Sequence, residues 1–274
     1  MSAPVDLYDN AYAHYDADVY RQVRLATYGQ DLGQTGWATT QESNEIPRTL
    51  QLTRASRVLE IGCGSGRYAL QVASTLGCRV LGLDLNVPGV HNAQSLAAAQ
   101  NLSTQTQFLV ADASQSLPFA DSSFDAAFSN DVLCHIPARL GVLRELHRVL
   151  RPGSRLLFSD ALVIGGVISH QELATRSSIG YYLFSPPGEN ERLLQEAGFH
   201  VLTVTDTSAN AAQIADRWRE ARQQHAADLQ KIEGPENFQG LQNFLATVHT
   251  LCRERRLLRL LYVAEATKSQ PLRS

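Results

Sequence analysis

Short apolar runs alternate with helical patterns between residues 56 and 160. The apolar runs predict buried strands at residues 57–61, 79–84, 107–110, 125–129 and 155–159. Helices are predicted between them: one over 67–76 that Gly77 ends, one that Asn86 opens as N-cap, and one carrying leucines at helical spacing from Leu140 to Leu150. Strands that alternate with helices imply right-handed crossovers and a mostly parallel sheet covered on both faces.

The rhythm changes after residue 160. A long segment, 161–188, contains Gly165-Gly166 and Tyr181-Tyr182, and a helix over 189–197 and a strand over 201–205 follow it. A polar helical insert then runs from 209 to 258, before a last strand at 260–264. An insert of that size between two strands is typical of a cap over a site. The prediction is an α/β fold with a doubly wound, mostly parallel, seven-stranded sheet and a helical cap inserted before the last strand.

Composition narrows the class of protein. Of the 274 residues, 44% are hydrophobic and 19% are charged, which is typical of a globular chain and excludes general disorder. The net charge of -3 argues against a nucleic-acid partner. The basic run of Arg253, Arg255, Arg256 and Arg259 is interpreted as a solvated helix face.

The four cysteines form no CxxC pair and have no spaced histidines beside them, so no metal site is expected and the thiols are expected to be reduced. The N-terminal stretch is polar and acidic, unlike a signal peptide, and no apolar run is long enough to span a bilayer. A cytoplasmic location is predicted.

A glycine loop joins the first strand to the first helix of the alternating region. Gly62, Gly64 and Gly66 are spaced as GxGxG, and Glu60 lies two residues before them. Glycines allow a tight turn and a close approach of a ligand to the backbone. The dinucleotide fingerprint requires its third glycine at position 67, which is Arg67 here, and this disfavours an NAD-dependent oxidoreductase.

Polar residues follow the next three strands. Asp84 ends the second strand, where a carboxylate can accept both hydroxyls of a ribose. Asp112 follows the third strand, where its oxygen can accept an adenine amino proton, although a plain turn residue is the alternative. Asn130 leaves the fourth strand, whereas Asp125 at its start is interpreted as a structural carboxylate.

Together these residues resemble the motifs of the class I S-adenosylmethionine-dependent methyltransferases. Residues 60–66 match the family's first motif, Asp84 its ribose acid, 111–113 its adenine motif, 124–125 its fourth-strand motif and 150–153 its turn before the fifth strand. The resemblance implies a Rossmann-like fold, with an N-terminal helical cover (1–45) and a methyltransferase domain (46–274). S-adenosyl-L-methionine is the implied cofactor, and S-adenosyl-L-homocysteine its product. The implied cofactor-binding residues are Glu60, Gly62, Gly64, Gly66, Asp84, Leu85, Asp112, Ala113 and Asn130.

Within that family the chain most resembles the small-molecule branch of the tocopherol, sterol and ubiquinone C-methyltransferases and the sarcosine/dimethylglycine N-methyltransferases. Residues 129–137 resemble the branch's "hxxxHhP" pattern, although Asn86-Val87-Pro88 replaces the usual Ser or Thr after the ribose acid. His135 is the implied catalytic residue, able to take a proton from an acceptor, and a histidine that only hydrogen-bonds the loop is the equal alternative.

The resemblance predicts in-line methyl transfer to the N, O or C atom of a small-molecule acceptor. The alternatives are an inactive cofactor-binding or nucleotide-binding regulatory module and the disfavoured oxidoreductase. Residues 1–45, 161–188 and 209–258 are expected to form a mobile cover over the acceptor. A homodimer is left open. Aromatic side chains of these segments are candidates for substrate contact, with core packing as the alternative for each: Trp37, Tyr181, Tyr182, Phe184 and Trp218.

Overall fold

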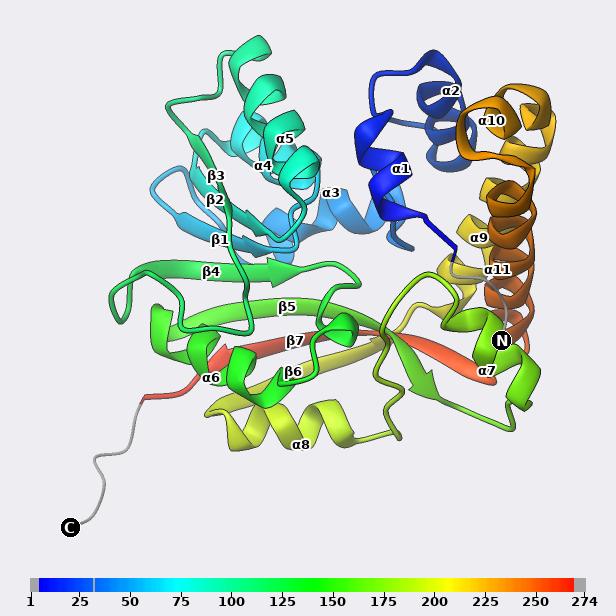
Figure 1. The fold of residues 1–274 in the computed structure, drawn as a ribbon. Coiled ribbons are helices and arrows are strands. Elements are labelled where there is room, and N and C mark those ends of the chain that lie inside the picture. The colour runs from blue at the N-terminus through cyan, green and yellow to red at the C-terminus, as the bar shows by residue number, and fades with distance from the viewer. Residues whose placement is uncertain (1–4, 32, 269–274) are drawn as a thin grey trace.

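The computed structural model describes residues 5–31 and 33–268. Within them a seven-stranded sheet has the order β3-β2-β1-β4-β5-β7-β6 (Figure 1). The first five strands run parallel, and β7 runs antiparallel to both of its neighbours. The predicted Rossmann-like, mostly parallel sheet is therefore confirmed. The strands are β1 (Arg57–Ile61), β2 (Arg79–Asp84), β3 (Thr106–Val110), β4 (Phe124–Ser129), β5 (Leu150–Ile164), β6 (Phe199–Asp206) and β7 (Leu257–Ala266).

The helices of the alternating region begin and end where their sequence patterns indicate. They are α4 (Arg67–Leu76), α5 (Val87–Ala99) and α6 (Arg139–Val149), and α8 (Glu189–Glu196) follows before β6. The Asn86 side chain caps α5 by accepting a hydrogen bond from the Gly89 N–H at 2.8 Å. The last strands are longer than predicted, because the antiparallel ladder between β5 and β7 continues to the pair Ile164 and Leu257. Residues 161–164 therefore belong to the sheet and not to a cover.

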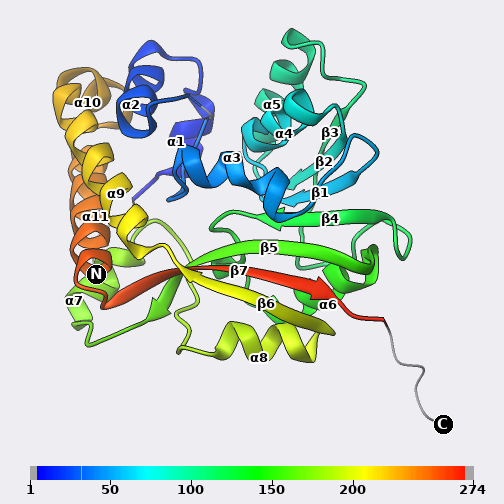
Figure 2. The same ribbon diagram turned by 180° about the vertical axis from the view of Figure 1, so that it is seen from behind.

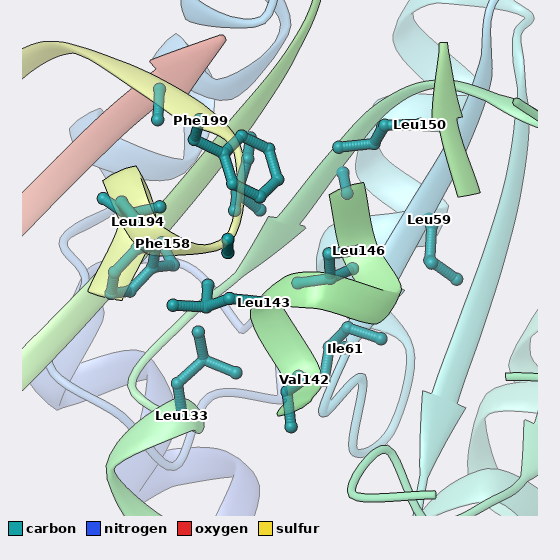
Figure 3. Close-up of a cluster of buried hydrophobic side chains, with 14 of the residues drawn as sticks. Leu59, Ile61, Leu133, Val142, Leu143, Leu146, Leu150, Phe158, Leu194 and Phe199 are labelled. Atoms are coloured by element: carbon teal, nitrogen blue, oxygen red, sulfur yellow. The ribbon is translucent and has the colours of Figure 1, made fainter. Parts of the chain in front are cut away.

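Helices cover both faces of the sheet. On one face α6 and α8 pack against β1, β4, β5 and β7, and Figure 3 shows the leucine ridge of α6 pointing into this core. The labelled side chains are Leu59, Ile61, Leu133, Val142, Leu143, Leu146, Leu150, Phe158, Leu194 and Phe199. On the other face α3 (Thr40–Thr49), α4 and α5 bury a second core with Val58, Val80 and Phe108. This is the two-sided burial expected of parallel strands.

The N-terminal helices and the insert form one helical layer at one end of the sheet. Figures 1 and 2 show α1 (Tyr8–Ala13) and α2 (Asp18–Tyr28) standing beside α9 (Ser208–Gln224), α10 (Ala226–Glu233) and α11 (Pro235–Arg253). They share a core that contains Trp37, Trp218 and Phe244. The predicted boundary between the N-terminal cover and the methyltransferase domain, after residue 45, falls inside α3. Residues 1–4, 32 and 269–274, which belong to these two predicted domains, lie outside the described part. No helix in that part is long and apolar enough to cross a membrane.

A buried ion cluster ties this helical layer to the sheet. Arg259 of β7 is fully buried, and its Nε donates to Asp131 Oδ1 while its Nη1 donates to Glu42 Oε1, both at 2.8 Å. Glu42 also closes the capping box of α3, where its Oε2 accepts from the Thr39 N–H. The predicted solvated helix face is thus wrong for Arg259, because α11 ends at Arg253 and the chain enters the sheet at Leu257.

Replacing Arg259 tests the cluster. Arg259→Gln leaves the buried Asp131 and the half-buried Glu42 without their cation, so we expect it to lower the free energy of unfolding by about 3–5 kcal/mol. Arg144→Gln is the matched control, because its pair with Glu196 is largely exposed and such pairs contribute about 0–1 kcal/mol. Urea unfolding measures both variants. Equal stability of Arg259→Gln and the control would show that the ion cluster does not stabilise the fold.

Candidate active site

A cavity of about 480 Å³ opens at the carboxyl ends of β1, β2 and β4. The strand ends form its floor, and α1, residues 33–37 and the loop 176–182 provide the other walls. Its volume is in the range of small-molecule sites, and the end of parallel strands where the strand order reverses is where open α/β sheets bind ligands. The predicted residues that line the cavity are Gly62, Gly64, Asp84, Leu85, Asp112, Ala113, Asn130, His135, Trp37, Tyr181 and Tyr182.

The glycine loop needs its glycines for close contact. Gly62 has a φ of 74°, and a Cβ there would lie 2.2 Å from Val132 Cγ2. Gly64 has a φ of 49°, and a Cβ would lie 2.3 Å from the Tyr12 hydroxyl. Gly66 does not line the cavity. A Cβ added at this position would clash with Ala93 and Phe108, so this glycine allows α4 and α5 to pack on the sheet.

Asp84 presents its carboxylate at the end of β2. Its Oδ2 accepts from the Gly64 N–H at 2.7 Å, and its Oδ1 accepts from the Asn86 N–H at 2.8 Å. Burial raises the pKa of Asp84, and these two backbone bonds oppose that rise. Since a carboxylate has about four lone-pair sites, each oxygen keeps the capacity to accept a ligand hydroxyl.

Two further predicted residues lie in the wall beyond Asp84. Asp112 Oδ1 accepts from the Ser114 N–H at 2.8 Å, so it serves the turn as well as lining the cavity. Hydrogen bonds from Ser114 lower the pKa of Asp112 and keep it ionised at neutral pH. Among the residues that the structure describes, the buried Asn130 Nδ2 atom has no hydrogen-bond partner. A buried donor without a partner is costly and favours a ligand acceptor at this point.

Glu60 does not line the cavity. Its side chain is 1% exposed behind the glycine loop, and its Oε2 has no partner. Burial raises the pKa of Glu60 well above its ordinary value, with the charge of Asp84 adding to the rise. The structure therefore places Glu60 under the loop, where it does not present its side chain to the cavity.

His135 follows β4 and is half-buried in the cavity wall. Its Nδ1 lies 3.1 Å from the Tyr181 carbonyl oxygen, and its Nε2 lies 3.2 Å from the Tyr8 hydroxyl. A carbonyl only accepts, so Nδ1 carries the proton and Nε2 accepts from Tyr8. Burial lowers the pKa of His135 to about 4, below the near-neutral value that its sequence position indicated. The ring is therefore neutral at physiological pH.

The aromatic candidates divide into two groups. Trp37, Tyr181 and Tyr182 line the cavity, whereas Trp218 and Phe184 do not. Trp218 packs behind Trp37 with their ring centroids 6.0 Å apart. Within the described chain, the insert 209–258 supplies no lining residue and supports the wall from behind.

The structure adds lining residues that the sequence reasoning missed, among them Tyr8, Tyr12, Asp131 and Arg176. The four-residue spacing of Tyr8 and Tyr12 in α1 was an available signal, since it places both on one helix face. Asp131 directly follows Asn130, but its backbone φ of 56° and its partner Arg259 depend on tertiary structure.

Comparison with known proteins agrees with this geometry. A family model described as a methyltransferase domain matches residues 59–158. The O-methyltransferase rstn1 of Aspergillus nomiae is 35% identical over 170 residues, which cover 62% of this chain and 75% of that protein. The 27-O-demethylrifamycin SV methyltransferase of Amycolatopsis mediterranei is 31% identical over 203 residues, covering 72% of this chain and 73% of that protein.

The chain belongs to the class I S-adenosylmethionine-dependent methyltransferases. It is therefore an enzyme that transfers methyl groups to small molecules. These relatives favour a methyltransferase over an oxidoreductase or an inactive cofactor-binding module. Its fold is similar to that of Haemonchus contortus phosphoethanolamine N-methyltransferase 2, solved with phosphomonomethylethanolamine and S-adenosylhomocysteine. That comparison has a TM-score of 0.79 at 21% identity and covers 95% of this chain and 60% of the other.

Removing the Asp84 carboxylate tests the cofactor side of the cavity. Hydrogen bonds to a charged group contribute about 1.5–3 kcal/mol each, so Asp84→Ala should weaken S-adenosylhomocysteine binding at least about tenfold. Calorimetric titration measures this, with Asp216→Ala on the surface of α9 as the control. Unchanged affinity in a folded Asp84→Ala variant would show that the ribose is held elsewhere.

Proposed function

We propose that this methyltransferase methylates a hydroxyl oxygen of its small-molecule acceptor. The observation that carries the proposal is His135, a neutral imidazole in the cavity wall whose Nε2 is an acceptor. An oxygen nucleophile must lose its proton during transfer, and a neutral histidine can take it. The relative rstn1 is named as an O-methyltransferase and the other as a 27-O-demethylrifamycin SV methyltransferase, and both names support oxygen as the methylated atom.

The cofactor side of the cavity fits S-adenosylmethionine. Gly62 and Gly64 line the cavity, Asp84 can accept the ribose hydroxyls, and the unpartnered Asn130 amide can donate to a ligand oxygen. Asp112 and Leu85 complete this wall. When bound, the cofactor supplies an electrophilic methyl group for in-line displacement, which mainly requires that the two reactants be positioned.

The acceptor side is organised around His135. The Tyr181 carbonyl holds the Nδ1–H and orients the ring, as a second partner does for a general base. Tyr8 occupies Nε2 by donating its hydroxyl, and an acceptor hydroxyl that takes its place can pass a proton to the same atom. The Tyr181 carbonyl then also stabilises the positive imidazolium.

The remaining expectations stay predictions. The mobile cover is supported by α1 and the loop 176–182, which line the cavity, whereas α9 to α11 contribute to it only through the packing behind Trp37. The four free, buried cysteines fit a reducing cytoplasm. The absence of a nucleic-acid partner also stays a prediction, and a homodimer stays open.

A panel of hydroxyl-bearing and amine-bearing small molecules tests the proposal. With isotopically labelled S-adenosylmethionine, mass spectrometry should find the label on a hydroxyl oxygen. His135→Asn should reduce kcat/KM for that product by about 10²–10⁴-fold, the usual contribution of a general base. His249→Asn is the matched control, because His249 also faces a backbone carbonyl, that of Ala212, but lies in α11 away from the cavity.

The dependence of activity on pH is an independent test of His135 as the base. Because the pKa of His135 is about 4, its base form predominates above pH 5, and activity should fall only as the pH drops toward 4. A labelled amine as the sole product would contradict the proposal, and so would a His135→Asn variant as active as His249→Asn.

A further inference from the structure

A buried arginine in the cavity wall lacks a carboxylate partner. Arg176, the last residue of α7 (His170–Arg176), is 1% exposed and lines the same cavity as His135. The other buried arginines of the described chain each pair with an acid: Arg24 with Asp31, Arg139 with Asp160, Arg222 with Glu233, and Arg259 with Asp131 and Glu42. Within residues 5–31 and 33–268, Arg176 has no such ion pair, and its Nε and Nη1 have no hydrogen-bond partner.

Aromatic rings surround the Arg176 guanidinium. Its central carbon lies 4.5 Å from the ring centroid of Tyr182, 5.1 Å from that of Phe244 and 5.8 Å from that of Trp37. Ring faces attract a cation, but they supply no acceptors for the N–H groups in the guanidinium plane. A buried charge is tolerated when it is both paired and hydrogen-bonded. The rings therefore hold the cation in place, and the Tyr182 hydroxyl also hydrogen-bonds the guanidinium. Nε and Nη1 of Arg176 remain available to a ligand.

Arg176 belongs to the acceptor side of the cavity. It packs on Tyr182, and the Tyr182 ring lies 4.5 Å from the His135 ring, centroid to centroid. After burial, the charge of Arg176 is among the causes that lower the pKa of His135, as expected for a nearby cation. The glycine loop is covered instead by Tyr12, which meets Gly64.

We propose that Arg176 binds an anionic oxygen group of the methyl acceptor, so that the acceptor is an acid. The guanidinium presents a planar fork of donors that matches a carboxylate. Such a group supplies the missing charge and the missing acceptors together. The inference rests on the proposed function for the reacting hydroxyl: the acceptor carries that hydroxyl at His135 and an oxyanion at Arg176.

Binding of benzoate and benzamide tests the proposal without turnover. The two probes share a shape that suits the aromatic wall, and only benzoate is charged. With the enzyme saturated with S-adenosylhomocysteine, calorimetry should show benzoate binding on the order of tenfold more tightly than benzamide. Arg176→Gln should abolish this preference, Arg176→Lys should keep part of it, and both should bind S-adenosylhomocysteine as the wild type does.

Equal binding of the two probes by the wild-type enzyme would overturn the proposal, and that comparison needs no variant to fold. Arg176→Gln that weakens S-adenosylhomocysteine as strongly as benzoate would also overturn it, because the guanidinium would then serve the cofactor. If benzoate is preferred through Arg176 but only amines are methylated, the anion site is supported and the methylation of oxygen is wrong.

Discussion

The ion cluster of Glu42, Arg259 and Asp131 is the interaction on which the site depends. A guanidinium that is fully buried in β7 requires carboxylates on both sides, and it takes one from α3 and the other from the turn after β4. Asp131 Oδ2 also accepts the Trp37 N–H at 2.9 Å, so the same carboxylate places an aromatic residue of the cavity wall. The helical layer and the sheet are thereby held in one arrangement, with the cavity between them.

Two polar side chains that line the cavity have buried donors without a hydrogen-bond partner in the described chain. Most buried polar atoms in a folded protein find a partner, as the Asp160 carboxylate does by accepting from Arg139 and Asn190 under β5. Asn130 and Arg176 differ, since both line the cavity and keep unpaired donors. We propose that Asn130 contacts the cofactor and Arg176 the acceptor. The cavity thus combines a fixed frame with donors that a bound cofactor and acceptor can satisfy.

The sequence predicted the sheet and the cavity-lining residues at its strand ends because their signals are local. The glycine spacing from Gly62, the acid Asp84 at a strand end and the helix limits all lie within a few residues of the structure they specify. The contacts that hold the helical walls of the cavity join residues far apart in the sequence, so no local pattern predicts them. The local sequence pattern assigns Arg259 to a charged helix face, because its partner Asp131 lies 128 residues away. Trp218 has the same aromatic signal as Trp37, and only tertiary packing places one of them behind the other.

The most direct test of this account is the affinity of Glu42→Gln for S-adenosylhomocysteine, measured by calorimetry on the folded variant. Glu42 is outside the cavity lining, so it influences binding through its partners: Arg259, which pairs with Asp131, and Thr39 at the start of α3. The account predicts weaker binding in Glu42→Gln and wild-type affinity in Glu45→Gln, whose partner Arg48 is exposed on the same helix. A Glu42→Gln enzyme that loses stability but binds S-adenosylhomocysteine with unchanged affinity would contradict it.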